Sequence, residues 1–192
     1  MTQILRLFCY LTASVLVAWP CAATADTWSF DPVRKDTSYK FGATEIVLTV
    51  DGTKSRTWPE FEMRVYDKGQ LQAQVRNIKF EQVFASPDQT TFVGLSNLGI
   101  PGTAIVVFDR RGAIRLLVNH GLAAFDYCEK SVTMLRRWYD EEKPNVQFNQ
   151  GKSRSITLRD CRGRTVDLVE VALDAYQRSA EEIRREKAAP RP

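Results

Sequence analysis

His120 is the only histidine in the chain, so any serine-histidine-acid triad must use it. The best-placed serine is Ser96, within Gly94-Leu95-Ser96-Asn97-Leu98-Gly99. That run is one residue longer than the nucleophile elbow G-x-S-x-G, which also needs a turn from a strand into a helix. Because Ser96 is expected between two strands, the pattern favours a structural or turn role for His120.

Acidic and aromatic residues meet where Asp140-Glu141-Glu142 follows Trp138-Tyr139. Aromatic rings stack on sugars, and paired carboxylates carry out glycoside hydrolysis, so this stretch is a candidate glycan site. The competing interpretation is a solvated acidic loop beside a core tryptophan. Both interpretations stay open at the level of sequence.

Cofactor and metal motifs are missing from the sequence. It has no P-loop, no Rossmann glycine run, no EF-hand and no pair of histidines at zinc-ligand spacing. A lone histidine would need unusual carboxylate partners to hold zinc. We therefore predict neither a cofactor nor a metal site.

Residues 1–25 have the pattern of a secretory signal peptide. Arg6 supplies the positive charge, Leu11 to Trp19 is mainly apolar, and Ala23-Thr24-Ala25 matches a small-x-small cleavage site. The apolar stretch is shorter than the roughly 20 residues of a membrane-spanning helix, which argues against an uncleaved anchor. We predict cleavage before Asp26 and a periplasmic or secreted protein without stable membrane insertion.

Two of the four cysteines, Cys128 and Cys161, remain after that cleavage. An even number in an oxidising compartment favours one disulfide. A metal pair or a reactive thiol is the alternative, but no second cysteine or histidine lies nearby at ligand spacing.

The predicted mature chain is short and mildly basic. It keeps 167 of the 192 residues, a length typical of one domain with its own core. Only Arg6 is lost among the charged residues, so 26 basic residues face 23 acidic ones, a net charge of +3. This charge does not require a nucleic-acid partner, which would be unusual outside the cytoplasm.

Strand signals dominate from Phe84 to Val118 and predict an antiparallel meander. Ser86-Pro87-Asp88 is a turn signal, and the tight turn 109–112 separates strands at 104–108 and 113–118. Val106 and Phe108 are expected to point into the core.

Further strands are predicted at 41–50, 61–66, 70–76, 122–138 with a turn at 129–131, 156–158 and 166–171. Leu71, Ala73 and Val75 are expected to face inward. Residues 26–39 are expected to form an extended lead-in that places Trp28 and Phe30 on the core. A change to three- and four-residue spacing predicts a helix over 174–187. We therefore expect a signal peptide at 1–25, an all-β domain at 26–173, and a helix with a disordered tail at 174–192.

One pattern occurs three times: a strand, an aspartate and a glycine turn, at Val65–Gly69, Val107–Gly112 and Leu158–Gly163. Repeats at roughly 40–50 residues in an all-β chain are typical of propeller blades. Phe84-Ala85-Ser86-Pro87-Asp88, with Phe92-Val93-Gly94-Leu95-Ser96, resembles the SPDG strand-turn-strand of β-propeller proteins such as the TolB and WD40 groups. Gln89 stands where that pattern has glycine.

The resemblance implies an antiparallel, propeller-like β-meander of about three blade-like units, capped by the C-terminal helix. Three units are fewer than the ~4–8 blades of a closed ring. The chain is therefore expected to be a blade-like meander, a partial propeller, or a subunit that completes itself as a homo-oligomer.

If the three turns stack as blade equivalents, their tips form one cationic rim. Its members are Lys68, Arg110, Arg111, Arg162 and Arg164. The aspartates of the turns, Asp67, Asp109 and Asp160, are expected to accept backbone N–H groups, which leaves the cations free. Arginine binds carboxylates and phosphates through paired hydrogen bonds.

The sequence favours an exported, non-enzymatic binding module for an envelope protein or an anionic envelope polymer. Trp138 and Tyr139 are further binding candidates. The alternative function is a periplasmic hydrolase acting on glycans or esters through His120 or the acidic loop. For the rim, the alternative is that charged turns are simply solvated.

Overall fold

The computed structural model describes residues 31–55, 58–131, 134–149 and 155–188, without the side chains of 186–188. The predicted signal peptide, Trp28, Phe30 and the end of the predicted tail lie outside the described residues. The first four strands form one antiparallel sheet in sequence order, called sheet A here. They are β1 (Arg34–Phe41), β2 (Thr44–Asp51), β3 (Glu60–Asp67) and β4 (Gln70–Arg76).

Sheet B repeats this order with the next four strands. They are β5 (Gln82–Ala85), β6 (Thr91–Leu95), β7 (Thr103–Asp109) and β8 (Ile114–Asn119). The meander predicted around 84–118 is therefore confirmed. Every β7 residue except Asp109 is buried, because sheet B is covered on both faces and its central strand has no polar side.

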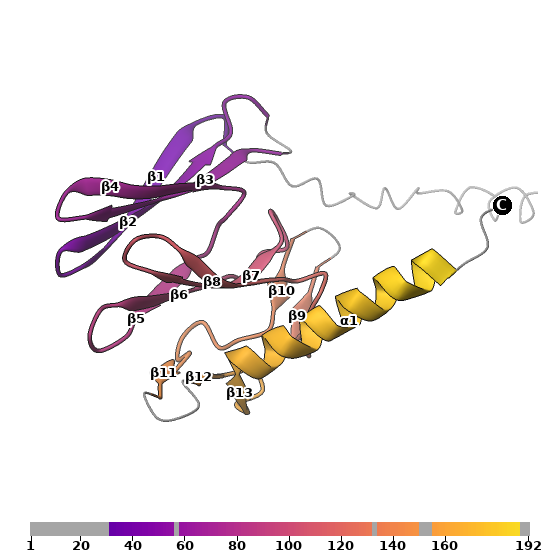
Figure 1. Cartoon of the computed structure of the whole chain (residues 1–192). Helices are drawn as coiled ribbons and strands as arrows, with labels where there is room; N and C mark the ends of the chain where they lie inside the picture. Colours follow the sequence, from indigo (N-terminus) through magenta and orange to yellow (C-terminus); the bar gives the residue numbers. More distant parts are fainter. Residues whose placement is uncertain (1–30, 56–57, 132–133, 150–154, 189–192) are drawn as a thin grey trace, which may run out of the picture.

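Sheet B lies between two apolar cores, with sheet A on one of its faces (Figure 1). The core between the sheets contains Phe92, Val106 and Phe108, and the rings of Phe92 and Phe108 stack with centroids 5.5 Å apart. Val106 and Phe108 are completely buried, as predicted. Val93 and Leu95 alternate with Phe92 and reach the second core on the other face.

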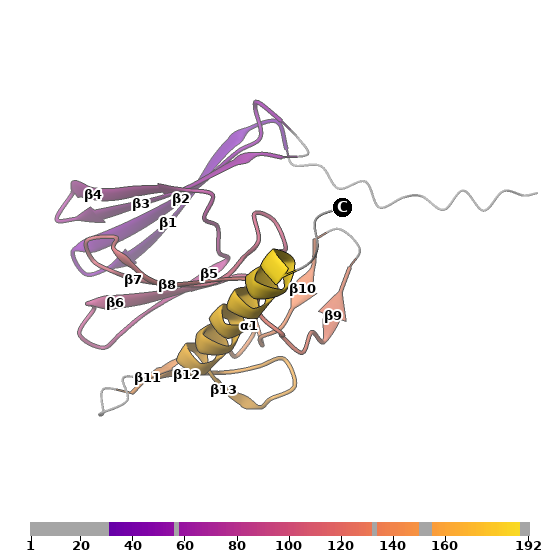
Figure 2. The ribbon, with the colours of Figure 1, turned by 45° about the vertical axis from the view of Figure 1, so that its right-hand side comes forward.

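The last third of the chain covers this second face (Figure 2). It contains the two-residue pair β9 (Glu129–Lys130) and β10 (Arg136–Arg137), then a small sheet of β11 (Gln147–Phe148), β12 (Ile156–Arg159) and β13 (Thr165–Asp167). Helix α1 (Leu168–Ala188) follows directly. The coarse prediction of antiparallel β-structure followed by one C-terminal helix is confirmed.

The strand predicted over 122–138 is wrong. In the described part of 122–138, the strand residues are the four of β9 and β10, together with an isolated bridge from Leu135 to Leu98, and residues 129–130 are strand rather than turn. The alternation that indicated a strand comprised Phe125, Tyr127, Val132 and Met134. Phe125 and Tyr127 reach the second core from irregular backbone and Met134 is buried, whereas Val132 lies outside the described residues.

The helix begins earlier than the predicted residue 174, and the strand predicted over 166–171 ends at Asp167. The Asp167 carboxylate accepts the N–H of Val169 at 2.8 Å, which is the bond of an N-cap residue. Glu170 three positions later completes the pattern of a helix start, a signal already present in the sequence.

Two details of sheet A also differ from the prediction. Residues 34–41 form β1 rather than an extended lead-in, and Gly42, with a φ of 56°, lies in the turn before β2. The expected inward position of Leu71 is wrong, because its side chain is 51% exposed. The register shifts between Val65 and Tyr66, so Tyr66 pairs with Leu71 and the alternation is interrupted there.

Candidate functional site

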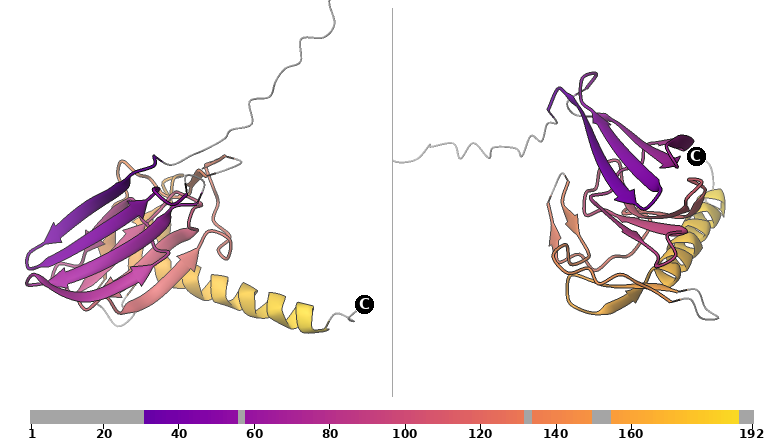
Figure 3. Two further views of the ribbon diagram at one scale, coloured as in Figure 1. Left: turned by 90° about the horizontal axis from the view of Figure 1, so that it is seen from above. Right: turned by 90° about the vertical axis from the view of Figure 1, so that its left-hand side faces the viewer.

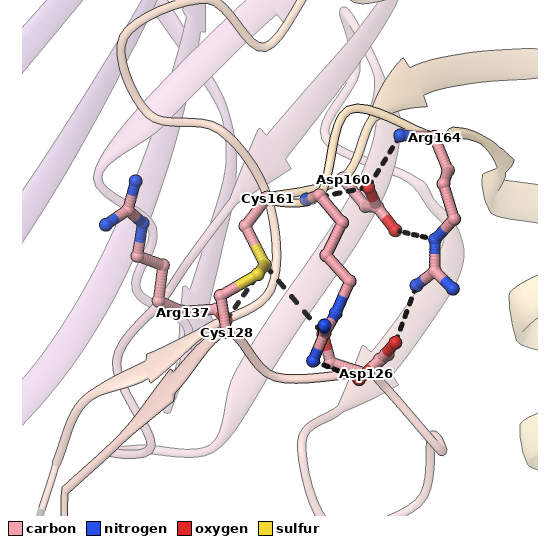
Figure 4. Close-up of polar contacts among 7 residues, drawn as sticks. Asp126, Cys128, Arg137, Asp160, Cys161 and Arg164 are labelled. Carbon is pink, nitrogen blue, oxygen red and sulfur yellow. Dashed lines mark hydrogen bonds and ion pairs between the residues drawn. A yellow bond between two sulfur atoms is a disulfide. The ribbon is translucent and has the colours of Figure 1, made fainter.

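The predicted disulfide is present and lies at the turn between β12 and β13 (Figure 4). It joins Cys128 to Cys161, whose Cα atoms are 6.1 Å apart. The bond fixes the irregular segment before β9 to the turn that follows β12.

Arg162 and Arg164 are not free cations, contrary to the prediction. Arg162 Nη2 and Arg164 Nη2 each lie 2.9 Å from a different oxygen of Asp126. Arg164 Nε also lies 2.7 Å from Asp160 Oδ2, as Figure 4 shows. These arginines therefore bind the turn to the segment around Asp126.

Asp160 is the centre of this cluster. Its Oδ1 accepts the N–H groups of Arg162 and Arg164, as predicted for the turn aspartates. Burial alone would raise the pKa of Asp160, but the hydrogen bonds from Arg164 and the two amides outweigh it, so that pKa lies below its usual value. The cluster is a structural support of the turn.

The other predicted tips lie at the opposite end of the strands. The hairpin turns of sheets A and B touch each other there: a Cβ on Gly42 would lie 2.4 Å from Gln89 Oε1, and one on Gly112 would lie 2.2 Å from the Cβ of Ala73. The start of β12 lies near the β5–β6 turn, because Ser155 and Ile156 line the same groove as residues of that turn. From there β12 runs away from the turn toward Cys161. The views in Figures 1 and 2 agree that the β12–β13 turn is apart from these hairpins. The three turns therefore do not form one rim.

Two of the three tips do come together. The β7–β8 turn with Arg110 and Arg111 packs through Gly112 on β4, which is joined to β3 by the turn that contains Lys68. All three cations are exposed, and none takes part in an ion pair within the part of the chain that the structure describes. Lys68, Arg110 and Arg111 are called the cationic edge below.

The turn aspartates beside the cationic edge are only partly as predicted. Asp109 accepts the N–H groups of Arg111 and Ala113, and it also pairs with Arg115 at 2.9 Å. Asp67 differs, since its carboxylate contacts the Thr44 hydroxyl at 3.5 Å.

Trp138 and Tyr139 cannot stack on a surface ligand in this structure, because they are 1% and 0% exposed. The Trp138 ring stacks on Phe125 with centroids 4.4 Å apart, and its Nε1–H donates to the carbonyl of Ser96. Both are core residues, and their assignment to a binding surface is a correction to the sequence prediction.

The acidic loop also serves structural contacts. Asp140 Oδ1 accepts the N–H groups of Glu142 and Lys143, which closes the turn. Glu141 Oε1 accepts a hydrogen bond from Asn97 Nδ2 at 2.7 Å. The loop does not line either of the two grooves found on the described part of the chain.

Asn97 is the residue that sequence reasoning missed. It is buried after β6, its Oδ1 accepts the N–H of Trp138, and its own N–H donates to Glu81 Oε2. One amide side chain thus connects sheet B to the segment 138–141. Only its place in the break after a strand could have indicated this role.

His120 is buried in an aromatic cluster with Phe125 and Tyr127. The Tyr127 hydroxyl donates to the carbonyl of His120, and its oxygen lies 3.3 Å from His120 Nδ1. Burial lowers the pKa of His120 to about 4; the nearby Ser96 backbone acts in the opposite direction, and the charge of Arg136 lowers the pKa further. Ser96 is likewise buried, and its Oγ accepts the N–H of Leu98 in a turn between strands.

A groove of about 680 Å³ lies between the β5–β6 turn, β8 and the start of α1. Ser86, Asp88 and Thr90 provide polar groups on one side, and Arg115 provides a cation. The apolar lining is Val107, Leu116, Phe148, Ile156 and Val169. Neither His120 nor the acidic loop reaches this groove, so the geometry brings no support to the hydrolase alternative.

No protein-family model matches the chain, and no curated protein matches its sequence. The propeller resemblance therefore stays a prediction.

Proposed function

We propose that the protein is an exported, non-enzymatic interaction module of the cell envelope that binds an anionic polymer or an acidic protein surface through the cationic edge. One observation carries this proposal: hairpins of two different sheets meet through Gly112 and Ala73, and the three cations at their tips have no acidic partner among the described residues. Arg110 and Arg111 offer planar donors that match carboxylate and phosphate oxygens.

Export is supported by the signal-like pattern of residues 1–25 and by the disulfide between Cys128 and Cys161. Disulfides persist in oxidising compartments such as the periplasm. No helix in the described ranges is long and apolar enough to cross a membrane.

We also propose that sheets A and B are equivalents of propeller blades. Each is a four-stranded antiparallel meander in sequence order, the arrangement of a blade. Gln89, in the position of the SPDG glycine, has a φ of 53°, a conformation that glycine adopts most easily. The unit containing Gly163 is smaller, with three strands.

The cationic edge is tested by replacing Lys68, Arg110 and Arg111 together with serine. Binding to immobilised polyglutamate and to lipopolysaccharide is then measured between 0.1 M and 1 M salt. Each charge contributes up to about 1 kcal/mol at an exposed site, so we expect a loss of roughly 10- to 100-fold at the lower salt concentration. Binding by the unmodified protein should weaken as salt rises, because the Debye length falls from about 10 Å to about 3 Å.

A matched control replaces Lys35, Arg76 and Arg185, three exposed cations elsewhere, with serine. It removes the same net charge and should bind almost as well as the unmodified protein. Equal losses in the two triple variants would show that only net charge matters and would contradict a site at the cationic edge.

A further inference from the structure

Helix α1 extends well beyond the sheets, as seen from above in Figure 3. Among the described residues, its first two turns pack on the second core, through Leu168, Ala172 and Ala175 with Val171 beside them. Apolar side chains on a neighbouring side of the helix remain largely exposed, with Leu173 56%, Tyr176 52% and Ile183 48% exposed. The Tyr176 hydroxyl donates to the carbonyl of Leu117 at 3.2 Å, which fixes its tip and leaves about half of the residue exposed. A helix that leaves so much apolar surface in water has room for a partner.

These exposed residues form one line along the helix. At 100° per residue, the residues of this line lie within about 40° of a common direction. They are Val169, Leu173, Tyr176, Ala180 and Ile183, called the α1 stripe here. Their alternating spacing of four and three is the seam spacing of a coiled coil.

The α1 stripe is complementary to itself when a second copy lies antiparallel. Leu173 then meets the partner's Ile183, and Tyr176 meets the partner's Ala180, so a large ring faces a small side chain in two equivalent places. In a parallel pair Tyr176 would instead face the partner's Tyr176, and the two rings would be crowded. Ala180 would face the partner's Ala180, and these two small side chains would leave a gap.

Charge beside the stripe favours the same orientation. Glu170, Gln177 and Arg184 follow the stripe on its open side at seven-residue spacing, and all three are exposed. In the antiparallel pair Glu170 lies beside the partner's Arg184, twice, and the two Gln177 side chains meet at the twofold axis. Neither Glu170 nor Arg184 has an ion-pair partner within its own chain among the described residues.

We propose that the α1 stripe is a homodimer interface in which the C-terminal helices of two copies pack antiparallel. Pairing over about 21 Å of helix buries less area than a standard interface, so the dimer is reversible and concentration-dependent. This interface is separate from the cationic edge, and neither proposal depends on the other.

Sedimentation of the purified protein from about 1 µM to about 200 µM tests the proposal. The unmodified protein should change from monomer to dimer over this range. Glu170→Arg and Arg184→Glu should each weaken the dimer at least tenfold, because each places two like-charge pairs across the interface. The double variant should restore dimerisation to within about threefold, and Arg185→Glu, on the opposite side of the helix, should change nothing.

The orientation is tested by a thiol at the axis. Cys128 and Cys161 are joined, so the Gln177→Cys variant has one free thiol among the residues that the structure describes. A short bis-maleimide should link two copies of this variant through that thiol. Arg185→Cys should not be linked. A protein that stays monomeric at every concentration, or single charge variants that dimerise normally, would overturn the proposal. Binding to polyglutamate should be unaffected in all these variants, so the two proposals fail independently.

Discussion

At the scale of single residues, His120 shows how the fold can exclude a chemical role. The residue is 6% exposed, its ring lies against Phe125 and Tyr127, and its buried Nε2 has no hydrogen-bond partner in the described chain. A residue in such a site is neutral at physiological pH and contributes to packing.

This environment predicts a specific pH dependence of stability. The pKa of His120 is about 4 in the folded protein and about 6.5 when unfolded, so the unfolded state gains a proton first as the pH falls. The stabilisation is fully present above pH ~6.5 and decreases toward pH ~4, by up to about 3 kcal/mol. Urea unfolding at several pH values should show this decrease.

The His120→Asn variant provides the comparison, since it keeps a polar atom near Tyr127 and cannot titrate. Its free energy of unfolding should be lower at neutral pH but nearly constant across that pH range. The lowered pKa values of Asp109 and Asp160 cause losses only at more acidic pH. An unchanged slope in the variant would show that His120 is not the titrating group.

At the scale of elements, the disulfide and the Asp126–Asp160 cluster join the irregular segment around 126–128 to the turn between β12 and β13. The described residues of segment 120–145 have little regular hydrogen bonding of their own, since β9 and β10 have two residues each. The conformation of the segment therefore depends on the disulfide and ion pairs to the β12–β13 turn, and on the hydrogen bonds of Asn97.

The double variant Cys128→Ser and Cys161→Ser should lose about 3–4 kcal/mol of unfolding free energy, because the 33-residue loop regains its freedom in the unfolded state. Urea denaturation followed by far-UV circular dichroism measures this. Reduction of the unmodified protein should give a similar loss. A loss below about 1 kcal/mol would mean that the ion pairs of Asp126 already restrain the loop.

At the scale of the whole molecule, sheet B is the layer on which everything else packs. Its β6 and β7 are buried on both faces, whereas sheet A has one polar face, and among the described residues no core member comes from α1 after Ala175. Local opening is rarest where both faces are covered.

Hydrogen exchange should therefore be slowest in β6 and β7 and fastest in residues 176–185 of α1 at low protein concentration. Protection of the α1 residues should rise with concentration if the helices pair. Mass spectrometry of peptides from these segments measures both effects. Faster exchange in β7 than in β1 would contradict the layered architecture.

The sequence alone determined the features that depend on neighbouring residues. Alternation and turn residues located most strands of sheets A and B, and two cysteines in a chain with a predicted export signal indicated the disulfide. These predictions succeed because side-chain direction in a strand and backbone preference in a turn are local properties.

Only the tertiary structure decided which residues are available for function. Arg162 resembles Arg111 in the sequence, since each stands two residues after an aspartate and directly before a glycine. Asp126 forms an ion pair with Arg162, whereas Arg111 has no ion pair among the described residues. Trp138 is a core residue because the carbonyl of Ser96 accepts its indole N–H. Burial and ion pairing depend on segments far apart in the chain, and no local pattern encodes which of those segments will meet.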